Sequence, residues 1–316
     1  MSMRDAFLEQ ILLSMNSNEK IFFVCADFGS PVLDIIRKNY PKRFINVGIA
    51  EQNLINISAG LSLEGFTVFA YAIAPFITMR CFEQIRVNLA LLSIVRPLNV
   101  NLIGVGAGYS YVVSGPTHQC YEDITLIRAM PNIQVLSPSD HISASALFDY
   151  CVNTGGTKYL RFDAQELPII YKNFIPDVKK GFYVHRFGKL VVIVASGYML
   201  HIAIKISELL LKENLQVGVI DLFNISNFKE HQLQNELNKY KGLVSMEEGF
   251  RGSGGIDSLF FDFINSREID IQLLNIGIDR KYCFEIGTRE ELHEMVGVGI
   301  NTVKKKVRNF ISEIST

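Results

Sequence analysis

The chain of 316 residues is 48% hydrophobic and has a formal net charge of −1, so it is long and apolar enough for two domains with large cores. The balanced charge, without a basic stripe, argues against nucleic acid as the main partner. No apolar run reaches the roughly 18 residues that a bilayer requires, the N-terminus does not resemble a signal peptide, and the five cysteines form no CxxC pair, so we expect a cytoplasmic protein with no membrane segment and no zinc site.

Apolar runs alternate with helical periodicity through the first half of the chain. Strands are expected at 21–25, 44–47, 67–71, 100–105, 133–136 and 159–162. Helices are expected at 3–16, 50–63, 77–93, 121–130 and 140–153. Such alternation predicts a mostly parallel sheet with helices on both faces.

The pattern breaks in the proline-containing segment before residue 188 and then restarts. Further strands are expected at 190–195, 217–220, 243–246 and 271–276, and further helices at 199–213, after 253–255 and at 299–314. The predicted fold class is α/β, with two three-layer αβα domains at 1–170 and 188–316 joined by a linker at 171–187. Segments 245–249 and 251–255 are typical of turns at strand ends, and the second domain is expected to be structural and to extend a dimer interface.

Glu51 stands where the strand at 44–47 is expected to run into a helix. Burial at such a place favours the protonated form of a carboxyl group, which then suits hydrogen bonding to a ring nitrogen and proton transfer on a cofactor. The alternative is an acid that simply complements the helix dipole.

The segment Gly106–Gln119 leaves the end of the strand at 100–105, where ligand crevices form in open α/β sheets. His118 is the acid–base candidate in this loop, and Gly115-Pro116 is expected to form a tight turn before it. A histidine on the surface without a role is the alternative. The Gly106-Ala107-Gly108 run is a weak phosphate-loop signal because no GxGxxG motif or P-loop lysine accompanies it.

Taken together, these segments resemble the thiamine-diphosphate enzymes of the transketolase family. The matching segments, in chain order, are 46–53, 76–86, 115–119, 122–128, 131–133 and 137–140. The resemblance covers essentially the whole chain, but only two of the family's domains: the pyrimidine-binding domain and the C-terminal domain.

The resemblance implies roles for individual residues. Glu51 matches the glutamate that bonds the aminopyrimidine of the cofactor, and Phe76 matches an aromatic that stacks on that ring. His118 matches a histidine that contacts substrate hydroxyls and assists proton transfer. Arg161 matches an arginine that grips the substrate phosphate, a task that suits a planar guanidinium. Core packing for Phe76 and an ordinary ion pair for Arg161 are the alternatives.

Three further residues are site candidates of the same kind. Arg80 lies one turn after Phe76 and is expected near the cofactor. Asp27 and Ser30 belong to a loop that borders the cofactor or the substrate in the family, and we expect Asp27 on the cofactor side and Ser30 on the substrate side.

Departures from the family fall in the region where substrate hydroxyls would bind. Ser114 stands where many members carry an acid, Gly106 where many carry a histidine, and Met79 where an aromatic is common. Ser114 is therefore a candidate substrate contact in an altered sugar pocket. We expect ketol transfer involving an unusual sugar phosphate or a nucleotide-linked sugar.

The family's magnesium motif, Gly-Asp-Gly, is absent from the sequence. Mg²⁺ requires a near-octahedral set of oxygen ligands, so its site and the cofactor diphosphate are expected on a separate N-terminal subunit, with no metal ligands on this chain. The resemblance therefore implies half of a split transketolase that needs thiamine diphosphate and Mg²⁺, with α2β2 as the expected assembly.

Three alternatives remain open. The chain could be the β subunit of a 2-oxoacid dehydrogenase, although Thr117-His118-Gln119 favours transketolase. Deoxyxylulose-phosphate-synthase chemistry is a second alternative, against which Ser114 counts. A non-catalytic partner of a true transketolase is the third, and the presence of Glu51 and His118 argues against it.

Overall fold

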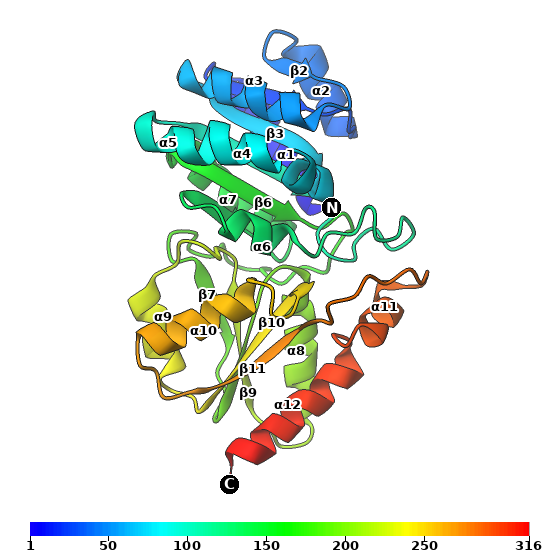
Figure 1. Cartoon of the computed structure of the whole chain (residues 1–316), viewed down its shortest axis with the longest axis vertical. Coiled ribbons are helices and arrows are strands. Elements are labelled where there is room, and N and C mark those ends of the chain that lie inside the picture. The colour runs from blue at the N-terminus through cyan, green and yellow to red at the C-terminus, as the bar shows by residue number, and fades with distance from the viewer. Residues whose placement is uncertain (316) are drawn as a thin grey trace.

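The computed structural model describes residues 1–315, and Figure 1 shows its two domains one above the other. The first domain is built on a six-stranded sheet in which all neighbours are parallel. Its strands, in spatial order, are β2 (Phe44–Asn46), β1 (Ile21–Cys25), β3 (Thr67–Ile73), β4 (Asn99–Val105), β6 (Gly156–Phe162) and β5 (Ile133–Leu136).

Helices cover both faces of this sheet because successive strand residues point to opposite sides. Phe23 packs in the cluster formed with α1 (Met3–Met15), α2 (Pro31–Asn39) and α7 (His141–Asn153). Val24, the next residue, packs in the cluster formed with α3 (Glu51–Leu63) and α6 (Asp123–Arg128).

The helix expected at 77–93 is present but is not a regular α-helix. It consists of a π-helical turn η1 (Phe76–Arg80), then α4 (Phe82–Ile85), a second π-helical turn η2 (Arg86–Leu91) and α5 (Leu92–Val95). Such π-helical turns recur at functional sites, and η1 carries two of the candidate residues.

The second domain has a five-stranded sheet. Its strands, in spatial order, are β11 (Gln272–Ile278), β10 (Gly242–Phe250), β8 (Val191–Ala195), β9 (Val217–Leu222) and β7 (Phe182–Arg186). All pairs are parallel except β7 with β9. One face is covered by α8 (Tyr198–Leu211), α11 (Arg289–Met295) and α12 (Ile300–Ile314), and the other by α9 (Glu230–Leu237) and α10 (Ile256–Ser266).

The two domains are joined along an edge of the first sheet. The amide of Ser137, just after β5, donates to the carbonyl of Phe223 at 2.8 Å, and the amide of Ile225 donates to the carbonyl of Val135 at 2.9 Å. Apolar residues from both domains also form one continuous core cluster. The two domains are therefore held together both by backbone hydrogen bonds and by a shared apolar core.

The α/β fold with two layered domains, predicted from the sequence, is confirmed. Two details differ. Residues 182–186, predicted within the linker 171–187, instead form β7, a short edge strand whose mixed polar and apolar residues give no continuous apolar signal. Residues 245–249, predicted as a turn, lie within β10, whose two glutamates are buried.

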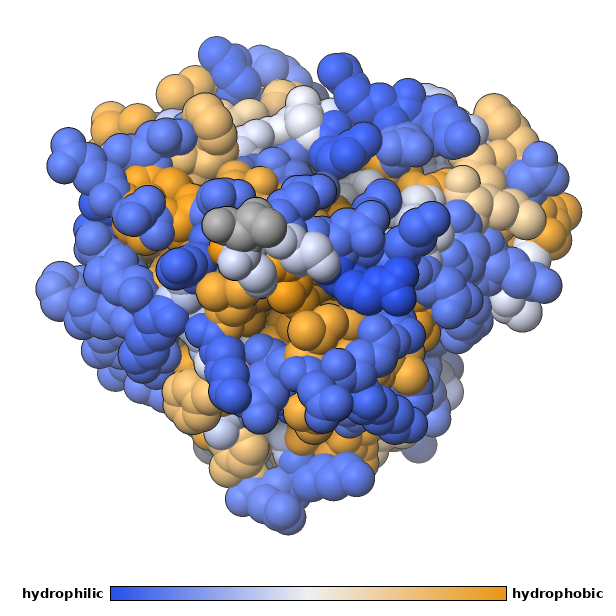
Figure 2. Space-filling view, turned by 90° about the horizontal axis from the view of Figure 1, so that it is seen from below, coloured by the Kyte–Doolittle hydropathy of each residue, from blue (hydrophilic) through white to orange (hydrophobic). Residues whose placement is uncertain are grey.

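The surface of the second domain, seen from below in Figure 2, shows apolar side chains gathered inside a hydrophilic border. None of the helices between residues 1 and 315 is both long and apolar enough to cross a bilayer.

Candidate active site

Glu51 is the first residue of α3 and lies at the end of the turn that follows β2. The residue before it, Ala50, offers no side-chain cap to the helix. Only 2% of Glu51 is exposed, and its Oε2 accepts a hydrogen bond from Nη1 of Arg80 at 2.7 Å. Its other oxygen accepts no hydrogen bond from residues 1–315. A buried carboxylate with one oxygen still available therefore stands at the N-terminal end of a helix.

The π-helical turn η1 brings Arg80 over Phe76. The guanidinium carbon of Arg80 lies 4.3 Å from the centroid of the Phe76 ring, within the range of a cation–π contact. The same guanidinium pairs with Glu51, so one planar group contacts both an aromatic face and a carboxylate. Because the side chain of Arg80 is 43% exposed, it covers this place from the solvent side.

His118 completes the group from a different element. Its ring meets Phe76 edge to face, with centroids 5.3 Å apart, and its Nδ1 lies 3.0 Å from Oγ1 of Thr117. The backbone amide of His118 donates to the carbonyl of Gly115, which has a φ of +68°. Glycine tolerates this left-handed conformation, so the Gly115-Pro116 turn sets the direction of the histidine.

A hollow of about 670 Å³ opens at this group, lined by Pro75, Phe76, Met79, Arg80, Pro116, Thr117, Glu122, Tyr282 and Phe284. The last two residues belong to the second domain, and the hydroxyl of Tyr282 donates to Oε1 of Glu122 at 3.1 Å. Burial raises the pKa of Glu122 above its usual range. Both domains therefore form the walls of the hollow.

Asp27 and Ser30 lie apart from this group. Asp27 has a φ of +47° and exchanges two hydrogen bonds with Asn46, at 3.2 and 3.1 Å. It borders a smaller hollow of about 110 Å³ near the start of α2. Ser30 caps α2 by accepting a hydrogen bond from the amide of Leu33 at 3.4 Å, which gives this buried side chain a structural task. Neither residue lines the larger hollow.

Ser114 lies exposed in the same loop as His118. Its carbonyl accepts a hydrogen bond from Oγ1 of Thr117 at 3.5 Å. Ser114 and His118 therefore both lie in the loop that follows β4.

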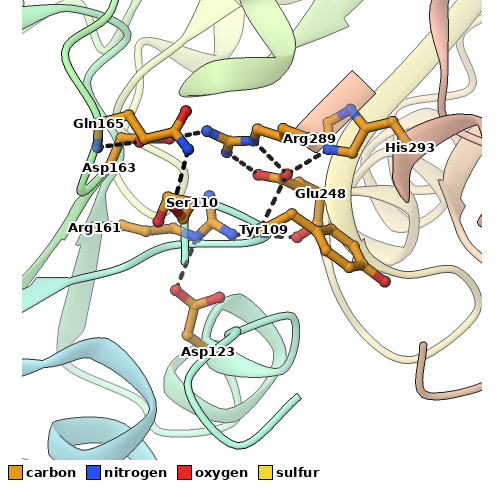
Figure 3. A network of polar contacts seen from close by, with 9 residues as sticks. All are labelled: Tyr109, Ser110, Asp123, Arg161, Asp163, Gln165, Glu248, Arg289 and His293. Atoms are coloured by element: carbon orange, nitrogen blue, oxygen red, sulfur yellow. Dashed lines mark hydrogen bonds and ion pairs between the residues drawn. The ribbon is translucent and has the colours of Figure 1, made fainter. Parts of the chain in front are cut away.

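Arg161, predicted to grip a substrate phosphate, is buried between the domains instead (Figure 3). Its Nε donates to Oδ2 of Asp123 at 2.8 Å, and its Nη2 donates to the carbonyl of Glu248 at 3.2 Å. Only 4% of the residue is exposed, and it does not line the hollow. The other interpretation of Arg161, an ordinary ion pair, agrees with this position, because Asp123 and the backbone of Glu248 already bind its guanidinium.

The sequence did not point to a second buried cluster beside Arg161. Glu248 on β10 accepts hydrogen bonds from Arg289 at 3.0 and 2.6 Å and lies 2.6 Å from Nε2 of His293 (Figure 3). Arg289 also donates to Oδ2 of Asp163 at 2.6 Å. Burial alone would raise the pKa of Glu248, but Arg289 and His293 hold that pKa well below its usual range. The only sequence signal was a pair of acids within an otherwise apolar strand.

Metal ligands are not grouped anywhere in the part of the chain that the structure describes: no three His, Cys, Asp or Glu side chains could jointly hold an ion.

Two family models match the sequence: "Transketolase, pyrimidine binding domain" over residues 1–169, and "Transketolase, C-terminal domain" over 181–303. The chain is 31% identical over 267 residues to a subunit of an apulose-4-phosphate transketolase of Actinobacillus succinogenes, covering 84% of each chain. It is 28% identical over 312 residues to a putative transketolase C-terminal section of Methanocaldococcus jannaschii, covering 96% of this chain and 95% of that one.

Longer relatives are matched in part. Human transketolase is 28% identical, and the match covers 98% of this chain but 49% of the human protein. Among solved structures, a split-gene transketolase described as an inactive beta4 tetramer superposes with a TM-score of 0.86 at 29% identity, covering 98% of both chains.

Proposed function

The chain belongs to the transketolase family, and on that basis we propose that it is one subunit of a split transketolase-like enzyme. Of the relatives matched over most of their own length, one is named as a subunit of its transketolase and another as a C-terminal section, which supports this division. The match to a split-gene transketolase chain over 98% of both lengths supports a diphosphate- and Mg²⁺-binding domain on a separate subunit. Chains of both kinds would then assemble as α2β2, in keeping with the symmetry of most oligomers.

The residues around Glu51 fit the aminopyrimidine ring of thiamine diphosphate. Such a ring has apolar faces and hydrogen-bonding edges. Phe76 offers an aromatic face at the hollow, and Glu51 offers a carboxylate oxygen that no residue from 1 to 315 engages. The guanidinium of Arg80, itself planar and hydrogen-bonding, already makes both kinds of contact in the structure. Phe76, Glu51 and Arg80 would thus hold the pyrimidine end.

The cofactor, when bound, supplies the carbon nucleophile that no side chain of this protein provides. The contribution of Glu51 would be to hold a proton at a ring nitrogen from a position shielded from water. Phe76 would fix the ring plane by stacking. His118, whose ring meets Phe76 edge to face, would contact substrate hydroxyls and move a proton to or from them.

The reaction we propose is ketol transfer between sugar phosphates or related sugars. One relative's name contains the sugar phosphate apulose 4-phosphate, which supports this class of substrate. The pocket would differ from that of standard transketolases near Gly106, because a side chain there would overlap with the ring of Tyr111. Ser114 and His118 are the proposed substrate contacts, whereas the buried position of Arg161 removes it from this set.

The proposal depends on one observation: Glu51, Arg80, Phe76 and His118 form an unbroken series of contacts. Phe76 and Arg80, the two middle members of this series, line the hollow. The test is Glu51→Gln, assayed with a diphosphate-binding subunit, thiamine diphosphate, Mg²⁺ and sugar phosphates. Because the amide cannot take over the proton, we expect turnover to fall at least about 100-fold while the two kinds of chain still assemble.

Glu83→Gln is the matched control, since Glu83 is an exposed glutamate on α4 that pairs with Arg86. It should leave turnover unchanged. Unaltered turnover in Glu51→Gln would favour a non-catalytic partner instead. Full ketol transfer by the isolated chain would refute the split arrangement.

A further inference from the structure

The loop that carries His118, residues 106–119, is attached to the second domain by the packing of Tyr109 in its apolar core and by a hydrogen bond to one acidic side chain. The backbone amide of Tyr109 donates to Oε1 of Glu248 at 3.0 Å. Glu248 lies on β10 and is 2% exposed, so this contact is sealed from water. A buried charge-assisted hydrogen bond to a backbone amide fixes the position of the main chain rather than of one side chain.

Glu248 is itself held rigidly. Arg289 engages both of its oxygens, through Nε at 3.0 Å and Nη2 at 2.6 Å, and His293 lies 2.6 Å from Oε1. The guanidinium of Arg289 also packs 3.5 Å from the centroid of the Tyr198 ring. These contacts fix the position of the carboxylate. We therefore expect the carboxylate to determine where the loop backbone lies, and not the reverse.

The same network holds the next residue of the loop by its carbonyl. Arg289 donates to Asp163 at 2.6 Å, and Asp163 accepts a hydrogen bond from the amide of Gln165 at 2.8 Å. The side-chain amide of Gln165 donates to the carbonyl of Ser110 at 3.0 Å. Figure 3 shows these contacts meeting the backbone of two consecutive loop residues, Tyr109 and Ser110.

Gly108 shows how closely the loop approaches Glu248. It has a φ of +56°, and a Cβ added there would overlap with the carboxylate of Glu248. The same glycine exchanges two hydrogen bonds with Cys120, at 2.8 and 3.0 Å, which close the base of the loop. His118 stands two residues before Cys120. Because Gly108 is paired with Cys120 and Tyr109 is bonded to Glu248, the place of Glu248 influences the place of the histidine.

Stability alone gives a poor account of this cluster. Replacing buried ion pairs by well-packed apolar residues is often neutral or stabilising, because removing charges from water is costly. A buried acid held by Arg289 and His293 is therefore better explained by the geometry that it imposes. Within residues 1–315, Tyr109 is the only loop residue whose backbone amide donates a hydrogen bond to the Glu248 carboxylate.

We propose that Glu248, held by Arg289, is a positioning residue through which the second domain sets the place of His118 in the active site. The inference rests on the proposed role of His118. It gives the second domain a defined part in the reaction of the first.

The test uses Glu248→Gln, Gly108→Ala and the double variant. The two single substitutions disturb the contact between Glu248 and the loop, one from each side. Glu247→Gln is the matched control, because Glu247 is the adjacent buried glutamate of β10 and contacts the amide of Asp257 rather than the loop. In the assembled enzyme we expect each single variant to lower kcat/KM up to about 100-fold, mostly through KM for the sugar phosphate. The double variant should lose little more than the worse single variant.

Hydrogen exchange of the full-length chain provides a readout that needs no activity. Peptides from residues 106–119 should exchange about tenfold faster in Glu248→Gln, while peptides from β8 and β9 keep their protection. Should Glu248→Gln not fold, Gly108→Ala alone carries the test. Normal kinetics with unchanged loop protection in a folded variant, or additive effects in the double variant, would overturn the proposal.

The two proposals fail in different ways. If wild-type enzyme shows no ketol transfer but Glu248→Gln speeds exchange in the loop, the proposed function is wrong and the attachment of the loop stands. If Glu51→Gln abolishes turnover while Glu248→Gln changes neither kinetics nor exchange, only the positioning role is refuted.

Discussion

Asp221 should make the stability of this protein depend on pH in a direction opposite to that of an ordinary paired acid. It is fully buried on β9, and its Oδ2 accepts hydrogen bonds from Ser139 at 2.9 Å and Tyr171 at 2.7 Å. Its Oδ1 has no partner among residues 1–315. Burial raises the pKa of Asp221 from 3.8 to about 7.

The sign of the pH dependence of the unfolding free energy follows from which state, folded or unfolded, loses the Asp221 proton at the lower pH. The unfolded chain releases it near pH 3.8, whereas the folded chain keeps it until about pH 7. The free energy of unfolding therefore falls as the pH rises through this interval, and the loss is complete above it. A difference of about three pH units between the two pKa values corresponds to about 4 kcal/mol at pH 8.

Asp221→Asn keeps the shape of the side chain and removes the proton equilibrium. Urea denaturation at pH 5 and pH 8 should show the variant gaining on the wild type by about 3 kcal/mol between the two pH values, since about two pH units of the interval are crossed. Asp149→Asn, at an exposed position of α7, is the control and should not change the pH dependence. An equal difference between Asp221→Asn and the wild type at both pH values would refute the reasoning.

Two further predictions concern the site and its surroundings. Arg161→Met leaves Asp123 buried without its cation and should lower the free energy of unfolding by about 3–5 kcal/mol in a denaturant titration, while sugar-phosphate affinity of the folded enzyme stays unchanged. Loss of phosphate-dependent affinity without loss of stability would restore the phosphate-binding role. Phe76→Leu should weaken thiamine diphosphate binding by the assembled enzyme about 3- to 10-fold by calorimetry, because the aromatic face is lost while the bulk is kept. Unchanged affinity would exclude stacking.

The sequence predicted best those elements whose signal is local. The strands β1 and β5 begin and end where their apolar runs do, because nearly all residues of these parallel strands are buried. The edge strand β7 was missed because its residues Phe182–Arg186 mix polar with apolar side chains and only the first of them is buried.

The candidate site was predictable in part for a related reason. Glu51 and His118 follow strands whose carboxyl ends meet at one edge of the sheet, so local patterns placed both there. Phe76 and Arg80 came from the family resemblance, and the π-helical turn that brings them together has no signature in the sequence. The partners of Arg161 lie 38 and 87 residues away in the chain, so no local spacing could have distinguished a phosphate-binding arginine from a structural one.

The adjacent acids Glu247 and Glu248 show why buried charges resist interpretation from sequence. Successive strand residues face opposite sides of the sheet, so the two carboxylates enter different surroundings. Burial and the nearby Asp257 raise the pKa of Glu247 to about 7, while Arg289 and His293 lower that of Glu248 against the effect of burial. The same side chain type is thus poised to hold a proton on one face and to stay ionised on the other. Arg289 and His293, the partners that lower the pKa of Glu248, lie 41 and 45 residues further along the chain, so no local pattern could have separated the two glutamates.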